Sequence, residues 1–61
     1  MNERLLVDMT DGLINEAGYI KLALQKDETA LADYHMEKLI MAALDLRRTL
    51  FLETHRSGEV V

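Results

Sequence analysis

The 61-residue chain has no cysteine, no proline and no tryptophan, and it has only one phenylalanine and two tyrosines. Without cysteine, disulfides and thiolate metal sites are excluded, and two histidines alone do not predict a structural metal. The longest run of apolar residues spans only 39–44, whereas a membrane-spanning helix needs about 20 residues. We therefore expect a cytoplasmic protein without metal, cofactor or membrane segment.

Positive charge is also scarce, because seven lysines and arginines face eleven acidic residues and leave a net charge of −4. Such a balance opposes a general electrostatic attraction to nucleic acid or anionic lipid. The three glycines are isolated, so no glycine-rich phosphate loop is present. The sequence also lacks Glu-x-x-His pairs and any recognisable nucleophile motif, which predicts that the protein is not an enzyme.

What the chain does contain is helical periodicity on both sides of a short polar break. We predict one domain over 1–56, with helices at 3–25 and 30–56, a turn at 26–29, and a flexible tail at 57–61. A break of four residues makes the two helices antiparallel neighbours. The predicted fold class is therefore all-α, an antiparallel two-helix hairpin.

Local signals define the helix ends. Asp27 or Thr29 is a suitable N-cap for the second helix, because its side-chain oxygen can accept a backbone N–H. His55 and Arg56 followed by Gly58 match the chemistry of a helix C-terminus.

The first predicted helix carries one narrow apolar stripe, with steps of three and four residues. Asp11 and Gly12 form a dipeptide typical of turns, so a break at Gly12 is the alternative to a continuous helix. The stripe keeps its phase across this point, which favours one helix. The stripe consists of Leu6, Met9, Leu13, Ala17, Ile20 and Leu24.

The second predicted helix has a stricter repeat, in which small and large apolar residues alternate in heptad steps. Ile40, Leu44 and Phe51 form a second stripe about 100° away around the helix. A helix that is apolar on several sides is buried on several sides. The main stripe consists of Ala32, Met36, Leu39, Ala43, Leu46 and Leu50.

One hairpin can cover only one of these apolar surfaces. A chain of this size buries about 60% of its unfolded surface and is marginally stable alone. We therefore expect two hairpins to associate as a homodimeric four-helix bundle. The stripes allow parallel or antiparallel docking of the two hairpins.

The two histidines have structural interpretations. His35 lies beside the second-helix stripe and has no carboxylate or histidine three or four residues away, so a boundary histidine is favoured over a metal ligand. His55 lies in the last helical turn, where a cation complements the helix dipole.

Two surfaces are candidates for binding a partner. Tyr34, Met41 and Leu52 lie on one line of the second helix opposite its stripe and predict contact with another protein. A basic end made by Arg47, Arg48 and Arg56 is the alternative, a contact for nucleic acid phosphates.

The predicted architecture resembles Rop-type helical hairpins, small acidic chains that dimerise into a four-helix bundle and contact RNA. The likeness rests on length, the short turn and the alternation of small and large residues, and no motif matches residue by residue. We expect a non-enzymatic regulator, adaptor or inhibitor, of the kind found among bacterial and phage accessory proteins, that binds itself and an unidentified protein. The alternative is Rop-like binding of structured RNA through the basic end of the second helix.

Overall fold

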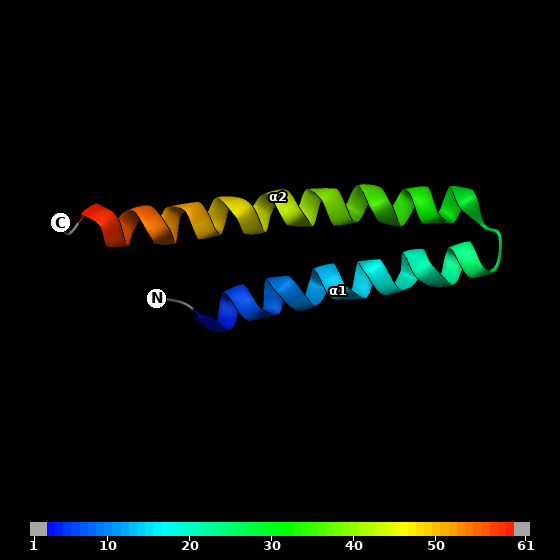
Figure 1. Cartoon of the computed structure of the whole chain (residues 1–61), viewed down its shortest axis with the longest axis horizontal. Coiled ribbons are helices and arrows are strands. Elements are labelled where there is room, and N and C mark those ends of the chain that lie inside the picture. Colours follow the sequence, from blue (N-terminus) through cyan, green and yellow to red (C-terminus); the bar gives the residue numbers. More distant parts are fainter. Residues whose placement is uncertain (1–2, 60–61) are drawn as a thin grey trace.

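The computed structural model describes the backbone of residues 3–59 and the side chains of residues 3–55. Two helices, α1 (Glu3–Gln25) and α2 (Thr29–Glu59), are joined by a short turn and lie side by side in opposite directions (Figure 1). No strand occurs in residues 3–59. The predicted all-α, antiparallel hairpin is therefore confirmed.

The turn is closed by backbone groups. The N–H groups of Asp27 and Glu28 donate to the carbonyl oxygens of Leu24 and Ala23, at 3.1 and 2.8 Å. Asp27 has a φ of 59°, the left-handed conformation found at the residue that follows a helix. These bonds satisfy carbonyl groups that the end of α1 would otherwise leave without partners.

The expected N-cap role of Asp27 is therefore wrong, because Asp27 ends α1 instead of starting α2. Thr29 is the first residue of α2, and the carbonyl of Glu28 accepts the N–H of Ala32 at 3.0 Å. The N-cap position thus belongs to Glu28, whose carboxylate is near the positive end of the helix dipole.

The rest of the helices follows the prediction except at the C-terminal end of α2. Helix α1 is continuous through Gly12, in agreement with the phase of its apolar stripe. Helix α2 continues through Gly58 to Glu59, beyond the predicted end at residue 56. A glycine costs a helix about 1 kcal/mol, and with no proline nearby this cost does not stop the helix. Residues 60–61 of the expected tail lie outside the described residues.

The contact between the helices follows a strict seven-residue repeat on both elements. The side chains that α1 turns toward α2 are at least half-buried, and they recur in steps of three and four: Leu6, Met9, Leu13, Glu16, Ile20 and Ala23. Helix α2 contributes Ala32, His35, Leu39, Ala42, Leu46, Thr49 and Glu53 in the same steps. We call these residues the seam. A repeat of 3.5 residues keeps one side of each helix facing its neighbour.

The seam is narrow and rich in small residues. Among the described side chains only Ala23 and Ala32 are buried, with 2% and 6% of their surface exposed. Both lie next to the turn, where short side chains let the two backbones approach. Large side chains are packed only partly, so the isolated hairpin has little hydrophobic core.

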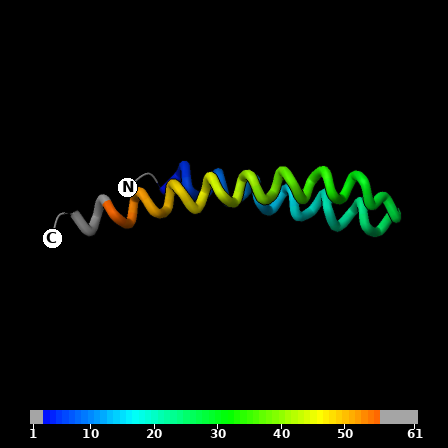
Figure 2. Tube along the Cα trace, turned by 90° about the horizontal axis from the view of Figure 1, so that it is seen from above, coloured from blue at the N-terminus to red at the C-terminus, as the bar shows by residue number. Residues whose placement is uncertain are grey.

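The molecule is long and thin, with extents of 51 × 17 × 10 Å. Its radius of gyration is 14.8 Å, whereas a compact chain of 61 residues has about 10.5 Å. Helix α2 has 31 residues and α1 has 23, so α2 is roughly 12 Å longer. Its C-terminal part extends past the start of α1 (Figures 1 and 2).

Candidate interaction surfaces

A polar and aromatic cluster crosses the seam in the half of the hairpin nearer the turn. His35 of α2 and Glu16 of α1 form a hydrogen bond between the imidazole Nδ1 and the carboxylate Oε1 at 2.7 Å. The side chains are 16% and 17% exposed. The carboxylate accepts, so the imidazole carries its proton on Nδ1 and donates it. This bond joins residues 19 positions apart in the chain and fixes the helices in one register.

Two tyrosines enclose the imidazole. The ring of Tyr19 stacks on His35 with centroids 4.9 Å apart, and the ring of Tyr34 meets His35 edge-on at 5.1 Å. Lys38 lies 5.2 Å from the centre of the Tyr34 ring and 3.9 Å from Glu16 Oε2. Because Lys38 is about half exposed, its ion pair contributes little, whereas the sheltered bond between His35 and Glu16 contributes more.

The described contacts of this cluster link the two helices. A hydrolytic site needs a nucleophile next to the histidine, but the hydroxyls of Thr10 and Thr49 donate to carbonyl oxygens four residues earlier in their own helices, each at 2.9 Å. Within the described residues, no group of three or more metal-ligating side chains occurs. No described helix is both long and apolar enough to cross a membrane.

Sequence reasoning missed the partner of His35, because it examined only positions on the same helix. The position of the turn could have revealed this partner, because it sets which residues of the two helices face each other. Once the chain is folded back at 26–28, residues whose numbers add up to about 55 face each other, as Ala23 and Ala32 do. On this rule Ile20 faces His35, and Glu16 is one turn away from Ile20.

The cluster also defines the two broad faces of the hairpin. Tyr19 and Tyr34 both contact His35, so they lie on the same face. Met41 and Leu52 follow Tyr34 at 7 and 18 residues along α2, which returns each to the same side of the helix at 100° per residue. We call this side, with Lys38, the aromatic face.

The opposite face is aliphatic. At 100° per residue, Ala17 and Leu24 lie across the α1 seam from Tyr19, and Met36 and Leu50 lie across the α2 seam from Tyr34. Ala43 is half-buried at the edge of the same side, and the other four are exposed. We call these five residues the apolar face.

The predicted stripes therefore divide into two groups. Leu6, Met9, Leu13 and Ile20 on α1, and Ala32, Leu39 and Leu46 on α2, lie in the seam. The remaining members of the predicted stripes form the apolar face. At several turns the structure uses a smaller or polar neighbour between the helices, such as Ala23 beside Leu24 and His35 beside Met36. A heptad pattern alone cannot distinguish such adjacent positions.

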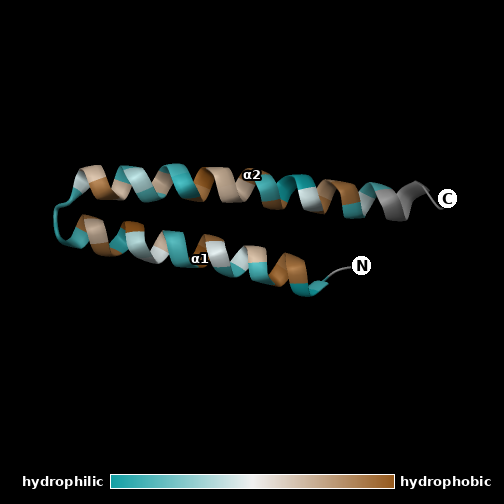
Figure 3. Ribbon diagram, turned by 180° about the vertical axis from the view of Figure 1, so that it is seen from behind, coloured by the Kyte–Doolittle hydropathy of each residue, from teal (hydrophilic) through white to brown (hydrophobic). Residues whose placement is uncertain are grey.

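The predicted partner line is exposed along its length. Tyr34 is 54% exposed, and Met41 and Leu52 are each 59% exposed. The second predicted stripe is exposed as well, and it lies on the outer side of α2: Ile40, Leu44 and Phe51. Hydrophobic residues recur along α1 and along the coloured part of α2 (Figure 3).

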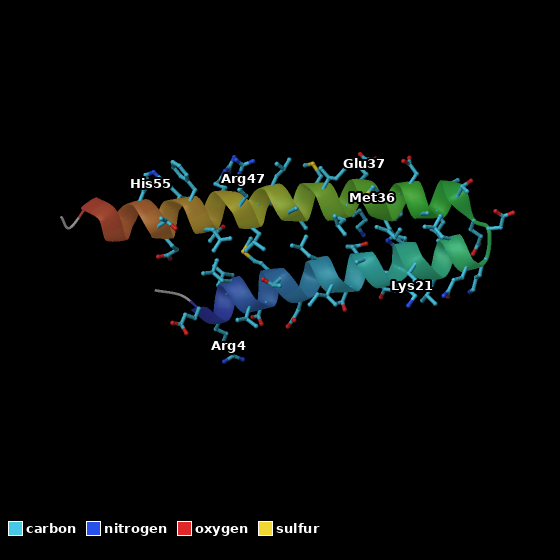
Figure 4. All side chains as sticks on the ribbon, viewed as in Figure 1. Arg4, Lys21, Met36, Glu37, Arg47 and His55 are labelled. Carbon is cyan, nitrogen blue, oxygen red and sulfur yellow. The ribbon has the colours of Figure 1, made fainter. Side chains whose placement is uncertain are left out.

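The basic end is only partly described. Arg47 and Arg48 are exposed, and Arg47 points away from α1 (Figure 4). Neither forms an ion pair with another described residue. The side chain of Arg56 lies outside the described residues. His55 stacks on Phe51, with ring centroids 3.7 Å apart, and its Nδ1 donates to the Phe51 carbonyl oxygen at 2.9 Å.

An open groove lies on α1 alone. It is centred on Gly18, where an added Cβ would meet no atom within 4 Å, and it faces away from α2. Its lining consists of Ile14, Asn15, Gly18, Tyr19, Lys21, Leu22 and Gln25.

Comparison of the chain with protein-family models, curated proteins and solved structures finds no match. Any functional proposal for this protein therefore rests on its own residues and surfaces.

Proposed function

We propose that this protein is a non-enzymatic cytoplasmic homodimer, a four-helix bundle of two hairpins, and that it acts by protein–protein contact as a regulator, adaptor or inhibitor. The observation that carries the proposal is the amount of apolar side-chain surface that one hairpin leaves in water. Fifteen large hydrophobic side chains are at least 43% exposed. Exposed apolar patches of this extent mark interaction sites in soluble proteins.

The exposed area supports one further copy as the first partner. The chain has a solvent-accessible surface of 5022 Å². A compact monomer of 7.0 kDa exposes about 4,000 Å². The difference, roughly 1,000 Å², is close to the 800 Å² or so that each partner contributes to a standard interface.

Stability favours association for the same reason. Burial of apolar surface stabilises by roughly 25 cal/mol per Å². Two associated hairpins bury more of this surface than the narrow seam of one hairpin does. The sequence offers no disulfide, which is the other common way to stabilise a domain of this size.

The dimer is tested by the dependence of unfolding on protein concentration. For a dimer that dissociates as it unfolds, each tenfold increase in concentration adds about 1.4 kcal/mol to the free energy of unfolding. We expect the thermal midpoint, followed by helical circular dichroism, to rise over a hundredfold concentration range. A midpoint that stays constant over this range contradicts the dimer.

Contact with another protein is proposed for the line formed by Tyr34, Met41 and Leu52. These side chains are exposed and lie on one side of α2. The double variant Tyr34→Ala with Met41→Ala removes two of them and leaves every seam residue in place, although it removes the edge-on contact of Tyr34 with His35. Capture from native lysate should lose its specific protein with this variant and should be unaffected by nuclease, while equal capture by both chains contradicts the assignment.

Binding of structured RNA is the second candidate, because Arg47 and Arg48 are exposed and a dimer doubles their number. This function predicts binding that weakens steeply with salt, since phosphate contacts release counterions. Replacing both arginines by glutamine should abolish RNA binding and leave the dimer intact. Binding that does not change with salt or with this substitution removes the candidate.

A further inference from the structure

We propose that the second copy covers the apolar face, made by Ala17, Leu24, Met36, Ala43 and Leu50, and that the aromatic face stays directed to solvent. This inference rests on the proposed dimer and deepens it, because it states which side of the hairpin is the interface. It also makes Tyr34, Met41 and Leu52 available to a different partner.

The direction of the apolar stripes is the first reason. In a four-helix bundle each helix has two neighbours at about a right angle, so its apolar stripe points between them. On α1 the apolar stripe beside the seam includes Ala17 and Leu24 on this side. On α2 it includes Met36 and Leu50. Leu5 and Leu31 are exposed beside the seam on the other side, but there Lys38 and Asp45 interrupt the apolar residues of α2. The uninterrupted apolar stripes of both helices therefore face the same side of the hairpin, as a bundle requires.

The charge on the two faces is the second reason. On the aromatic face, Asp45 and Lys38 lie on α2 within the line that carries Tyr34 and Met41. Covering this face would remove these two charges from water, which costs several kcal/mol unless each finds a partner. Farther from the seam the two sides are alike on α1, because Asp8 on the aromatic side and Lys21 on the apolar side each lie 100° from a seam residue. On α2, Arg47 points away from α1 (Figure 4).

A second copy is the occupant that fits this face. Two-fold dimers bring identical patches together, and a patch of aliphatic side chains is complementary to itself. The excess surface of roughly 1,000 Å² for one chain is also what one partner of such a dimer buries. Small residues at Ala17 and Ala43 allow close approach of the facing helices.

Two pairs of residues on α2 give matched tests. Met36 and Met41 are 43% and 59% exposed in the hairpin, and Leu50 and Leu52 are 45% and 59% exposed. Each pair has the same residue type on the same helix, with one member on each face. Because the chain has no cysteine, a single thiol can report on either position.

The first experiment compares Met36→Cys with Met41→Cys by the rate of maleimide labelling at high and low protein concentration. Both substitutions replace an exposed methionine by a small apolar residue, so neither is expected to unfold the hairpin. We expect labelling at position 36 to slow by about tenfold or more at high concentration, and labelling at position 41 to change less than about twofold.

The second experiment compares Leu50→Glu with Leu52→Glu by the dissociation constant of the dimer, with circular dichroism as the control for folding. We expect the first to weaken the dimer about a hundredfold or more, because a carboxylate enters an apolar interface. The second should change it less than about threefold.

The possible results distinguish failure of the proposed interface from failure of the proposed dimer. A two-chain mass with protection at position 36 supports the inference. A two-chain mass with protection at position 41 overturns it but keeps the proposed dimer. A single-chain mass for the unmodified protein removes both.

Discussion

The aromatic face and the apolar face of this hairpin are formed by the same two helices but differ in how they meet solvent. On the aromatic face Tyr19 stacks on the seam residue His35 and Tyr34 meets it edge-on, above the hydrogen bond that joins His35 to Glu16 across the seam. The apolar face has five hydrophobic side chains, and none of them carries a charge or a hydrogen-bond donor. The difference teaches that polar and aromatic contacts within one chain organise the seam on one side of the hairpin, whereas the exposed side chains of the other side offer only apolar surface.

The largest change is expected for Leu46→Asp, which should unfold the hairpin and so disrupt both faces. Leu46 lies in the seam between the helices, and an unpaired charge there costs several kcal/mol. Circular dichroism should show loss of helix together with loss of the dimer. A variant that keeps its helix content and its mass shows that residue 46 is not in the core.

The next largest loss of stability is expected from the hydrogen bond across the seam, beside the aromatic face. Glu16→Ala and His35→Ala each remove one partner of a sheltered bond, and each should lower the free energy of unfolding by about 1–3 kcal/mol. In urea titrations the double variant should cost clearly less than the sum of the two. Simple additivity means that the two side chains do not interact in solution.

Gly18 lies outside both faces, so a substitution there serves as a reference for the dimer interface. At Gly18 an added Cβ meets no atom within 4 Å, so Gly18→Ala should stabilise α1 by about 1 kcal/mol through helix propensity. The dissociation constant of the dimer should not change. Weaker association in this variant would mean that the α1 groove, and not the apolar face, receives the second copy.

The turn offers a smaller stabilising change. Asp27 has a positive φ of 59°, which glycine adopts without steric cost. Asp27→Gly should raise the free energy of unfolding by about 0.5 kcal/mol, since aspartate already tolerates this conformation better than most residues. Asp27→Val is the opposite control and should lower it by about 1–2 kcal/mol. Equal stability of the two variants contradicts the turn geometry.

On the aromatic face no change is expected in helix content or mass, and only a small one in stability. Tyr34→Ala with Met41→Ala removes exposed side chains, so helix content and mass should stay the same and the unfolding free energy should fall by about 1 kcal/mol or less. A large loss of helix would place these two residues in a core.

Most of the fold follows from the sequence, because its strongest signals are local. The polar break predicts the hairpin, and the unbroken phase of Met9 and Leu13 predicts that α1 continues through Gly12. The turn conformation of Asp27 was not predicted, since the same residue suits either the end of one helix or the start of the next.

The surfaces are predicted less well, because they depend on which of two adjacent residues faces the neighbouring helix. Ala23 and Leu24 differ by 100° around α1, and apolarity favours the larger side chain. The backbones approach closely at this end, so the smaller residue lies in the seam. The pairing of Glu16 with His35 depends on how the two helices are aligned after the turn. The pattern of either helix alone does not give this alignment.

Sedimentation velocity on the unmodified protein at low micromolar concentration tests the central claim most directly. The account predicts one species with the mass of two chains, about 14 kDa from twice 7.0 kDa, and a frictional ratio of a compact bundle. A helical, cooperatively unfolding species of 7.0 kDa at these concentrations would contradict it.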